Sequence, residues 1–362
     1  MKRKQFVART LGTAAAGWAA LAGFSAPGST RPDPPALRGP LIQPPFLKAG
    51  DTVGITCPAS PLELKDMQNC RRALGNWGLQ VCVGNTVGQQ WERFGGTDAE
   101  RAADLQLMLN DPSIKAILFA RGGYGAMRIM DRLDWSAFRQ QPKWLIGYSD
   151  ITALHCHVHS VLGIPSLHAD MVNGFREQED VSTVSLRHLL HGQAIRYQIP
   201  AFGLNRPGQA TGMIVGGNLS LVAAMLGSKS ELNTAGKILF LEDVNEYKYT
   251  LDRMLVSLRR AGKFDQLAGL IIGGITATKA DSETQFPMSV EALVLEKVAD
   301  KTFPVCFNFP AGHIRNNMAL KLGVPHQLVV APEGCTLTEV SLASSMAPPV
   351  SIPIDSLEPD YK

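Results

Sequence analysis

The sequence predicts a mixed α/β protein, with a parallel-sheet α/β domain first and a β-rich α+β domain second. Between residues 50 and 190, short apolar strand patterns alternate with helical patterns, which is typical of a parallel sheet covered by helices. Beyond a Gly- and Pro-rich stretch at residues 204–212, strand patterns lead again. With 362 residues, 45% of them hydrophobic and 19% charged, the chain is large and apolar enough for two folded domains.

The N-terminal residues have the pattern of an export signal. Lys2, Arg3 and Lys4 precede an Ala-, Gly- and Leu-rich stretch, and this start is similar to a twin-arginine signal in which lysine replaces the second arginine. A permanent membrane anchor is the alternative, but a stretch made mostly of small residues is poorly suited to one. We therefore predict a signal peptide over residues 1–25, a Pro-, Gly- and Ser-rich linker over 26–45, and a periplasmic location.

The N-terminal domain is assigned to residues 46–200. Its expected elements are a strand at 51–56, a helix at about 62–77, a strand at 79–83, a helix at 97–109, and strands at 116–120 and 144–147. The second helix has the clearest boundary, because Thr97 followed three residues later by Glu100 forms a capping box. These elements predict a parallel sheet whose strand ends lie at one edge.

The C-terminal domain is assigned to residues 201–347. Strands are expected at 237–241, 269–273 and 303–306, and the region 325–342 has further strand patterns. A helix is expected at about 250–261, where apolar residues recur at helical spacing. Residues 348–362 are predicted to be a flexible tail.

Charge and cysteine content exclude some classes of function. The net charge is only +3, part of it in the first residues, so no nucleic-acid partner is expected. The six cysteines show neither CxxC pairing nor zinc-ligand spacing. Cys82 and Cys306 lie in apolar runs and are predicted to be buried free thiols. An exported chain could form one disulfide, but the sequence does not select the pair.

Two strand ends carry the residues best suited to chemistry. The strand at 116–120 runs into Gly122, Gly123, Tyr124 and Gly125, and the strand at 144–147 runs into a turn that contains Ser149. In α/β proteins such turns lie at the ligand-binding edge of the sheet. A serine there faces the positive end of a helix dipole and is placed like a nucleophile, with glycine N–H groups nearby as oxyanion donors. A purely structural N-cap is the alternative for Ser149.

A serine nucleophile needs a base, and the base needs an acid that orients it. His313 is the preferred base because it follows the strand at 305–309 through a short loop. Glu242 directly follows another predicted strand, with Asp243 beside it and Glu246 as a further acid candidate. The order serine, glutamate, histidine is that of α/β-hydrolases, although the turn lacks the second glycine of GxSxG.

Seven short motifs occur together in a characteristic order. They are residues 50–53 with 58–60, 96–98 with 101–105, 120–125, 147–152, 216–219, 241–243 with 252–255, and 312–313. With these motifs, the chain resembles the LD-carboxypeptidases over roughly residues 45–345. This is the muramoyltetrapeptide carboxypeptidase family, which includes the microcin C self-immunity peptidases.

The resemblance implies a Ser–His–Glu triad without a metal or other cofactor: Ser149 is the nucleophile, Glu242 the acid and His313 the base. It also implies an oxyanion hole formed by the N–H groups of Gly123 and Asp150. The implied reaction removes the terminal D-alanine from a murein tetrapeptide by cleaving the L,D bond after diaminopimelate, often in a homodimer. Many relatives act in the cytoplasm on recycled muropeptides, whereas the export signal here favours trimming in the periplasm.

Several residues keep alternative interpretations. Arg121 is expected either to bind a substrate carboxylate or to form an internal salt bridge. Tyr124 is expected to form a wall of the site, and Asn218 either contacts substrate or shapes a turn.

The sequence also offers alternative ligands and functions. His155 and His159 share a helical face, but no glutamate completes a metalloprotease motif, so no metal is expected. The glycine cluster lacks the spacing and the lysine of a phosphate loop. The alternative functions are an amidase that acts on peptide–nucleotide antibiotics, as in the immunity peptidases, and a non-catalytic muropeptide-binding protein.

Overall fold

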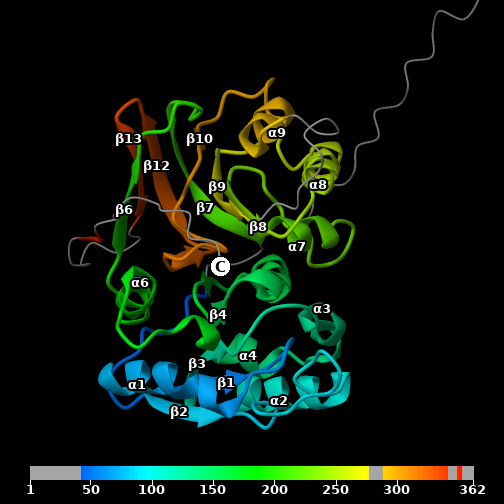
Figure 1. Cartoon of the computed structure of the whole chain (residues 1–362), viewed down its shortest axis with the longest axis vertical. Coiled ribbons are helices and arrows are strands. Elements are labelled where there is room, and N and C mark those ends of the chain that lie inside the picture. Colours follow the sequence, from blue (N-terminus) through cyan, green and yellow to red (C-terminus); the bar gives the residue numbers. More distant parts are fainter. Residues whose placement is uncertain (1–41, 277–287, 341–348, 353–362) are drawn as a thin grey trace, which may run out of the picture. The chain divides into compact units, whose positions relative to one another are not determined.

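Two β-sheets organise the chain, as expected for the predicted α/β class (Figure 1). The computed structural model describes residues 42–276, 288–340 and 349–352. The predicted signal peptide and most of the predicted linker lie outside these ranges. Within them, no helix combines the length and apolar character needed to cross a membrane.

The first sheet has six strands in the order β11-β5-β4-β3-β1-β2. Five are parallel: β1 (Thr52–Thr56), β2 (Gln80–Val83), β3 (Ile114–Phe119), β4 (Trp144–Gly147) and β5 (Ser166–His168). The sixth, β11 (Leu320–Leu322), is antiparallel to β5 and comes from the C-terminal half of the sequence. The parallel strands confirm the alternating pattern, because such strands require crossover connections.

Helices follow these strands along the chain, and the last of them leads to the second sheet. They are η1 (Leu64–Met67), α1 (Gln68–Asn76), α2 (Asp98–Asn110), α3 (Ala126–Ile129), η2 (Met130–Arg132), α4 (Ser136–Gln140), η3 (Ser149–Ile151), α5 (Thr152–His157), η4 (Val158–Leu162), η5 (Val172–Gly174) and α6 (Val181–Leu190). The predicted capping box of α2 is present. The Thr97 hydroxyl accepts from the Glu100 N–H at 3.3 Å, and the Glu100 carboxylate accepts from the Thr97 N–H at 2.8 Å. This cap fixes where α2 begins.

The second sheet has eight strands in the order β10-β9-β8-β7-β12-β13-β6-β14. They are β6 (Ile195–Pro200), β7 (Gly208–Asn218), β8 (Ile238–Val244), β9 (Gly269–Thr276), β10 (Val305–Cys306), β12 (Pro325–Ala331), β13 (Gly334–Glu339) and β14 (Val350–Ser351). The half from β7 to β10 is parallel, and β7, β12, β13 and β6 pair antiparallel.

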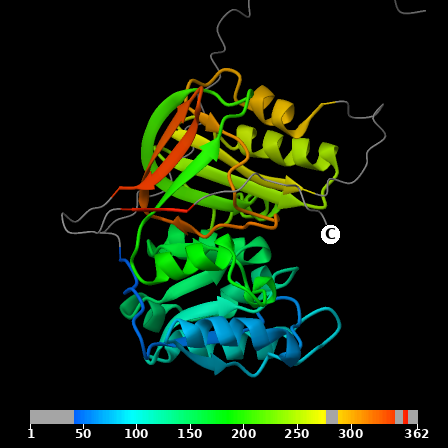
Figure 2. The same cartoon turned by 60° about the vertical axis from the view of Figure 1, so that its left-hand side comes forward.

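Helices accompany the parallel half of this second sheet. They are α7 (Leu219–Ala224), α8 (Lys248–Arg260) and α9 (Val290–Lys297). In Figures 1 and 2, α8 and α9 lie side by side next to β8 and β9. The first four residues of β8 are fully buried, as expected for a strand that helices cover, and the strand carries Glu242 near its end.

Three features differ from the sequence-based expectations. The chain enters the second sheet at β6, before the predicted boundary at residue 200, and returns to the first sheet with β11. Within the predicted flexible tail, residues 350–351 form β14, which pairs parallel with β6, while residues 353–362 lie outside the described ranges. The prediction that Cys82 is buried was wrong, because β2 is an edge strand of its sheet and leaves the Cys82 side chain exposed.

Candidate active site

Ser149 lies in a strained turn directly after β4. Its φ of +61° falls in the left-handed region, which residues other than glycine rarely adopt. Such a conformation costs about 1–3 kcal/mol and is concentrated at functional sites. The loop after β3, residues 121–125, is called the glycine loop below. It lies against this turn, since a methyl group added at Gly122 would be 2.9 Å from Ser149 Cβ. The sharp strand-to-helix turn presents the hydroxyl in the manner of a nucleophile elbow.

His313 connects Ser149 to Glu242. Its Nε2 is 3.1 Å from Ser149 Oγ, and its Nδ1 is 2.6 Å from Glu242 Oε2. The Glu242 carboxylate also accepts the backbone N–H of His313 at 3.2 Å. When Nδ1 donates to Glu242, Nε2 is left to accept the serine proton, as a general base does. The structure thus brings the three predicted residues together, and the acid in contact with His313 is Glu242.

The charges of this pair are mutually stabilised. Burial alone would lower the pKa of His313, but the charge of Glu242 and its hydrogen bond raise that pKa above its ordinary 6.5. Burial alone would raise the pKa of the fully buried Glu242, but His313 lowers it below its ordinary value. Glu242 therefore remains ionised and can stabilise an imidazolium on His313.

A second set of contacts holds the loop at residues 310–317, called the His313 loop below. The Gly312 N–H donates to Asn317 Oδ1 at 2.8 Å, and Asn317 Nδ2 donates to Asp170 Oδ1 at 2.8 Å. The Tyr148 ring packs on the His313 ring with centroids 4.8 Å apart. These supporting residues are not among those predicted from the sequence. Tyr148 adjoins Ser149 and could have been considered, but nothing in the sequence pairs Asp170 with Asn317.

The two predicted oxyanion donors lie in tightly packed loops. Gly123 has φ +101°, and a methyl group there would be 2.1 Å from Ser60 Oγ, so only glycine fits. The Ser60 N–H donates to the Gly122 carbonyl at 3.1 Å. The buried Asp150 carboxylate accepts the Ala126 N–H at 2.7 Å. Burial raises the pKa of Asp150, although this hydrogen bond opposes the shift.

The three predicted substrate-binding residues differ in exposure. Arg121 and Tyr124 are exposed on the glycine loop, and the Tyr124 ring packs against Phe94. Asn218 is buried: its Nδ2 donates to Asp243 at 3.0 Å and its Oδ1 accepts from the first turn of α7. This environment favours an orienting role for Asn218 beside Glu242, and its contact with substrate stays a prediction.

The two histidines considered as metal ligands, His155 and His159, and His157 between them have separate structural partners. His155 Nε2 lies 2.8 Å from the Gly147 carbonyl, and His157 Nδ1 lies 2.9 Å from the Ser230 hydroxyl. His159 Nε2 lies 3.2 Å from Lys237 Nζ. In the part of the chain that the structure describes, no group of three potential ligands has the arrangement of a metal site.

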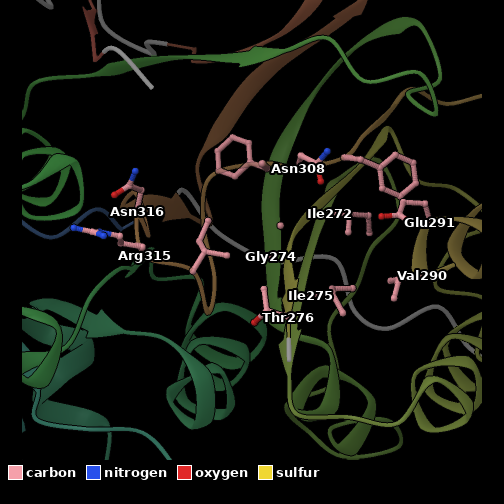
Figure 3. Close-up of a pocket in the computed structure, with 13 residues that line it drawn as sticks. Ile272, Gly274, Ile275, Thr276, Val290, Glu291, Asn308, Arg315 and Asn316 are labelled. Atoms are coloured by element: carbon pink, nitrogen blue, oxygen red, sulfur yellow. The ribbon is translucent and has the colours of Figure 1, made fainter. Parts of the chain in front are cut away.

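A pocket of about 330 Å³ adjoins the His313 loop (Figure 3). Glu291 and Val290 lie on one side of it, and Arg315 and Asn316 on the other. Thr276, which also lines it, donates its hydroxyl to the His313 carbonyl at 2.8 Å. The lining includes Ile314 and Arg315, which follow His313 in the chain, but Ser149, Glu242 and His313 do not line this pocket.

Comparison with known proteins gives a consistent assignment. Residues 53–169 match the LD-carboxypeptidase N-terminal domain, and residues 211–328 match the LD-carboxypeptidase C-terminal domain. The chain is 35% identical to a probable murein peptide carboxypeptidase of Bacillus subtilis, over 78% of this chain and 89% of that protein. It is 31% identical to the murein tetrapeptide carboxypeptidase of Pseudomonas aeruginosa, over 75% of this chain and 91% of that protein.

More distant relatives have the same fold. The microcin C7 self-immunity protein MccF of Escherichia coli is 26% identical, over 84% of this chain and 98% of that protein. A crystal structure of muramoyltetrapeptide carboxypeptidase from Oxalobacter formigenes superposes with a TM-score of 0.73 at 23% identity, covering 80% of this chain and 99% of that one. From the two matched domains and the closely related carboxypeptidases, we conclude that the chain belongs to the LD-carboxypeptidase family.

Proposed function

We propose that this protein is a serine-type LD-carboxypeptidase that removes the terminal D-alanine from murein tetrapeptides after diaminopimelate. The observation that carries the proposal is the continuous contact from Ser149 Oγ through His313 to the buried Glu242. The names of the relatives from Bacillus subtilis and Pseudomonas aeruginosa support a murein peptide as substrate. An intact triad also favours an enzyme over a non-catalytic binding protein.

The proposed reaction proceeds through an acyl-enzyme. His313 Nε2 accepts the hydroxyl proton as Ser149 Oγ attacks the carbonyl carbon of diaminopimelate. The N–H groups of Gly123 and Asp150 stabilise the oxyanion that forms. His313 then gives its proton to the departing amine of D-alanine, and the peptide remains bound as an ester to Ser149. Water, activated by His313, hydrolyses that ester and regenerates the serine.

Selection of a terminal residue requires recognition of its carboxylate. Arg121 is the proposed partner, because its exposed cationic side chain lies on the same loop as Gly123. Tyr124, also exposed there, is proposed to form a wall beside the leaving residue. We further propose that the protein acts in the periplasm, where it meets murein directly, and that it functions as a homodimer.

The decisive experiment compares purified protein on muramoyl tetrapeptide and on the same peptide with its terminal carboxylate amidated. We expect D-alanine release from the free acid only, because amidation removes the negative charge that Arg121 is proposed to bind. Ser149→Ala should lower turnover by about 10⁴- to 10⁶-fold. Equal rates on both peptides would contradict a carboxypeptidase. Preferred cleavage of an aminoacyl sulfamoyl adenosine would instead favour the immunity-type amidase.

A further inference from the structure

Arg101 is a buried cation that lies outside the Ser149–His313–Glu242 chain. It is on α2, and its side chain has no exposed surface. Its Nε donates to the Gly96 carbonyl at 3.1 Å, and one terminal nitrogen donates to the carbonyls of Gly125, at 3.0 Å, and Pro58. The other terminal nitrogen contacts Asp98. Three of its four acceptors are therefore main-chain carbonyls, which come from three separate loops.

These contacts bracket the glycine loop. The loop that contains Pro58 is also joined to the glycine loop by the hydrogen bond from the Ser60 N–H to the Gly122 carbonyl. Gly123 is pressed against Ser60 at this junction. Arg101 binds Pro58 on one loop and Gly125 on the other, so the Ser60–Gly122 hydrogen bond and the Arg101 contacts join the two loops before and after Gly123.

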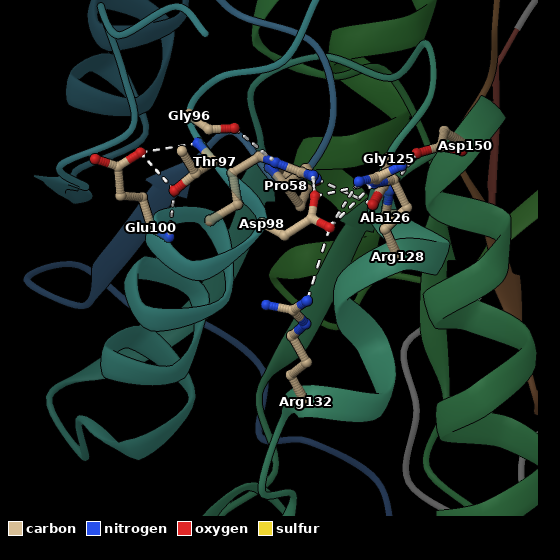
Figure 4. Close-up of polar contacts among 11 residues, drawn as sticks. Pro58, Gly96, Thr97, Asp98, Glu100, Gly125, Ala126, Arg128, Arg132 and Asp150 are labelled. Carbon is tan, nitrogen blue, oxygen red and sulfur yellow. Dashed lines mark hydrogen bonds and ion pairs between the residues drawn. The ribbon is translucent and has the colours of Figure 1, made fainter.

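The same guanidinium is connected to the Ser149 turn through one peptide group. The carbonyl of Gly125 accepts from Arg101, and the N–H of the same peptide, which belongs to Ala126, donates to Asp150 Oδ2 at 2.7 Å (Figure 4). Asp150 directly follows Ser149. The plane of this peptide is thus fixed at both ends, by a buried cation and by a buried carboxylate.

We propose that Arg101 is a positioning residue that fixes the backbone N–H groups of Gly123 and Asp150 at the separation a tetrahedral oxyanion requires. The inference rests on the proposed function, which gives those two N–H groups their role. A rigid guanidinium can hold several carbonyls in fixed directions at once, whereas the lysine ammonium is a flexible point charge. Loss of one oxyanion donor typically lowers kcat by about 10²- to 10³-fold.

The test is Arg101→Lys, with Arg132→Lys as the matched control. Arg132 also pairs with Asp98, at 3.9 Å, but its side chain is half exposed. On the tetrapeptide, we expect Arg101→Lys to lower kcat by about 100-fold and to change KM by less than about 3-fold. For the control Arg132→Lys, both kcat and KM should stay within about 2-fold of the wild-type values. The pH profile of Arg101→Lys should keep its acid limb, because His313 and Glu242 are unchanged.

Two further measurements separate positioning from general damage. A peptide boronic acid forms a tetrahedral anionic adduct with serine, so its affinity should fall by the same factor as kcat/KM. In a Ser149→Ala background, adding Arg101→Lys should change the dissociation constant of the uncleaved tetrapeptide by less than about 3-fold relative to Ser149→Ala alone. A KM effect alone, or boronate affinity equal to that of the wild type, would overturn the proposal.

Gly125→Ala provides a second variant in case Arg101→Lys does not fold. Its methyl group would be 2.7 Å from the Arg101 guanidinium, so it should displace that contact and give the same loss of kcat. Failure of both variants to fold would contradict the proposal, since it would make Arg101 a determinant of stability instead. An inactive wild type would refute the proposed function, whereas an active wild type with an unaffected Arg101→Lys would refute the Arg101 proposal alone.

Discussion

The turn at Ser149 departs from the usual GxSxG pattern at one position. Gly147 and Ser149 occupy the first two defining positions, but Ile151 stands where the second glycine is expected. Ile151 is buried, and a methyl group added at Gly147 would be 3.0 Å from its side chain. The first glycine is therefore needed for close packing. At the second position, Ile151 ends the helical turn η3, which begins at Ser149.

The charge state of His313 leads to a pH prediction. As a general base His313 must be neutral, and Glu242 raises its pKa above 6.5. The acid limb of the kcat/KM profile should therefore lie above pH 6.5. Activity should fall as the pH drops through this limb, because His313 becomes protonated.

Glu242→Gln tests the cause of that limb. Without the carboxylate, burial remains as the main influence and lowers the pKa of His313, so the limb should move to lower pH. The maximal rate should fall by roughly 10³- to 10⁴-fold, since the imidazolium loses its stabilising charge. Glu246→Gln serves as the control and should change neither the position of the acid limb nor the maximal rate. A shift produced by Glu246→Gln would make Glu246 the acid.

At this scale the sequence could identify the chemically reactive residues but not those that hold them. Ser149, Glu242 and His313 each follow a predicted strand, and this local signal was sufficient to nominate them. Asp170 and Asn317 are 147 positions apart, and their contact depends on how the chain returns to the first sheet. Such a pairing cannot be obtained from local patterns.

Among the structural elements, the connection between the end of β5 and the His313 loop depends on Asp170. Burial raises the pKa of Asp170 to about 7, above its ordinary 3.8. The folded protein therefore retains a proton there that the unfolded chain releases near pH 4. This difference stabilises the folded state fully below pH 4, and the contribution is lost as the pH rises towards 7.

Asp170→Asn should remove this pH dependence. Asparagine keeps an oxygen that accepts from Asn317 Nδ2, so the contact is preserved while the titration is lost. Between pH 5 and 7, the free energy of unfolding of the wild type should decrease relative to the variant by up to about 1.4 kcal/mol per pH unit. Urea unfolding at several pH values measures this. The exposed Asp265→Asn should follow the wild type, and parallel curves for all three proteins would contradict the assignment.

The exposure and pairing of the edge strands could not be predicted from the sequence. The run around Cys82 has an apolar pattern typical of a buried strand, but β2 has a neighbour on one side only. Strand order depends on crossovers rather than on the strand's own residues, so this exposure could not be predicted locally. The same reason applies to β14, a two-residue strand that depends on β6 for its pairing.

For the whole molecule, the proposed location gives a prediction about the mature chain. The basic start and the small-residue stretch favour removal of the signal peptide before residue 32. N-terminal sequencing of protein isolated from the periplasm should find a new terminus between about Gly23 and Arg31. A variant in which Arg3 and Lys4 are both replaced by glutamine is the control and should accumulate unprocessed. Recovery of native protein in the cytosol with Met1 or Lys2 at its end would contradict export.

The distribution of the triad over the sequence has a consequence for the timing of activity. Ser149 and His313 are separated by 164 positions, and β11, which follows His313, completes the sheet that carries Ser149. A chain that is still being synthesised therefore has a serine hydroxyl with no base beside it. A chain that ended before His313 would lack both the base and the last strand of the sheet that carries Ser149, so activity cannot precede folding of the C-terminal half.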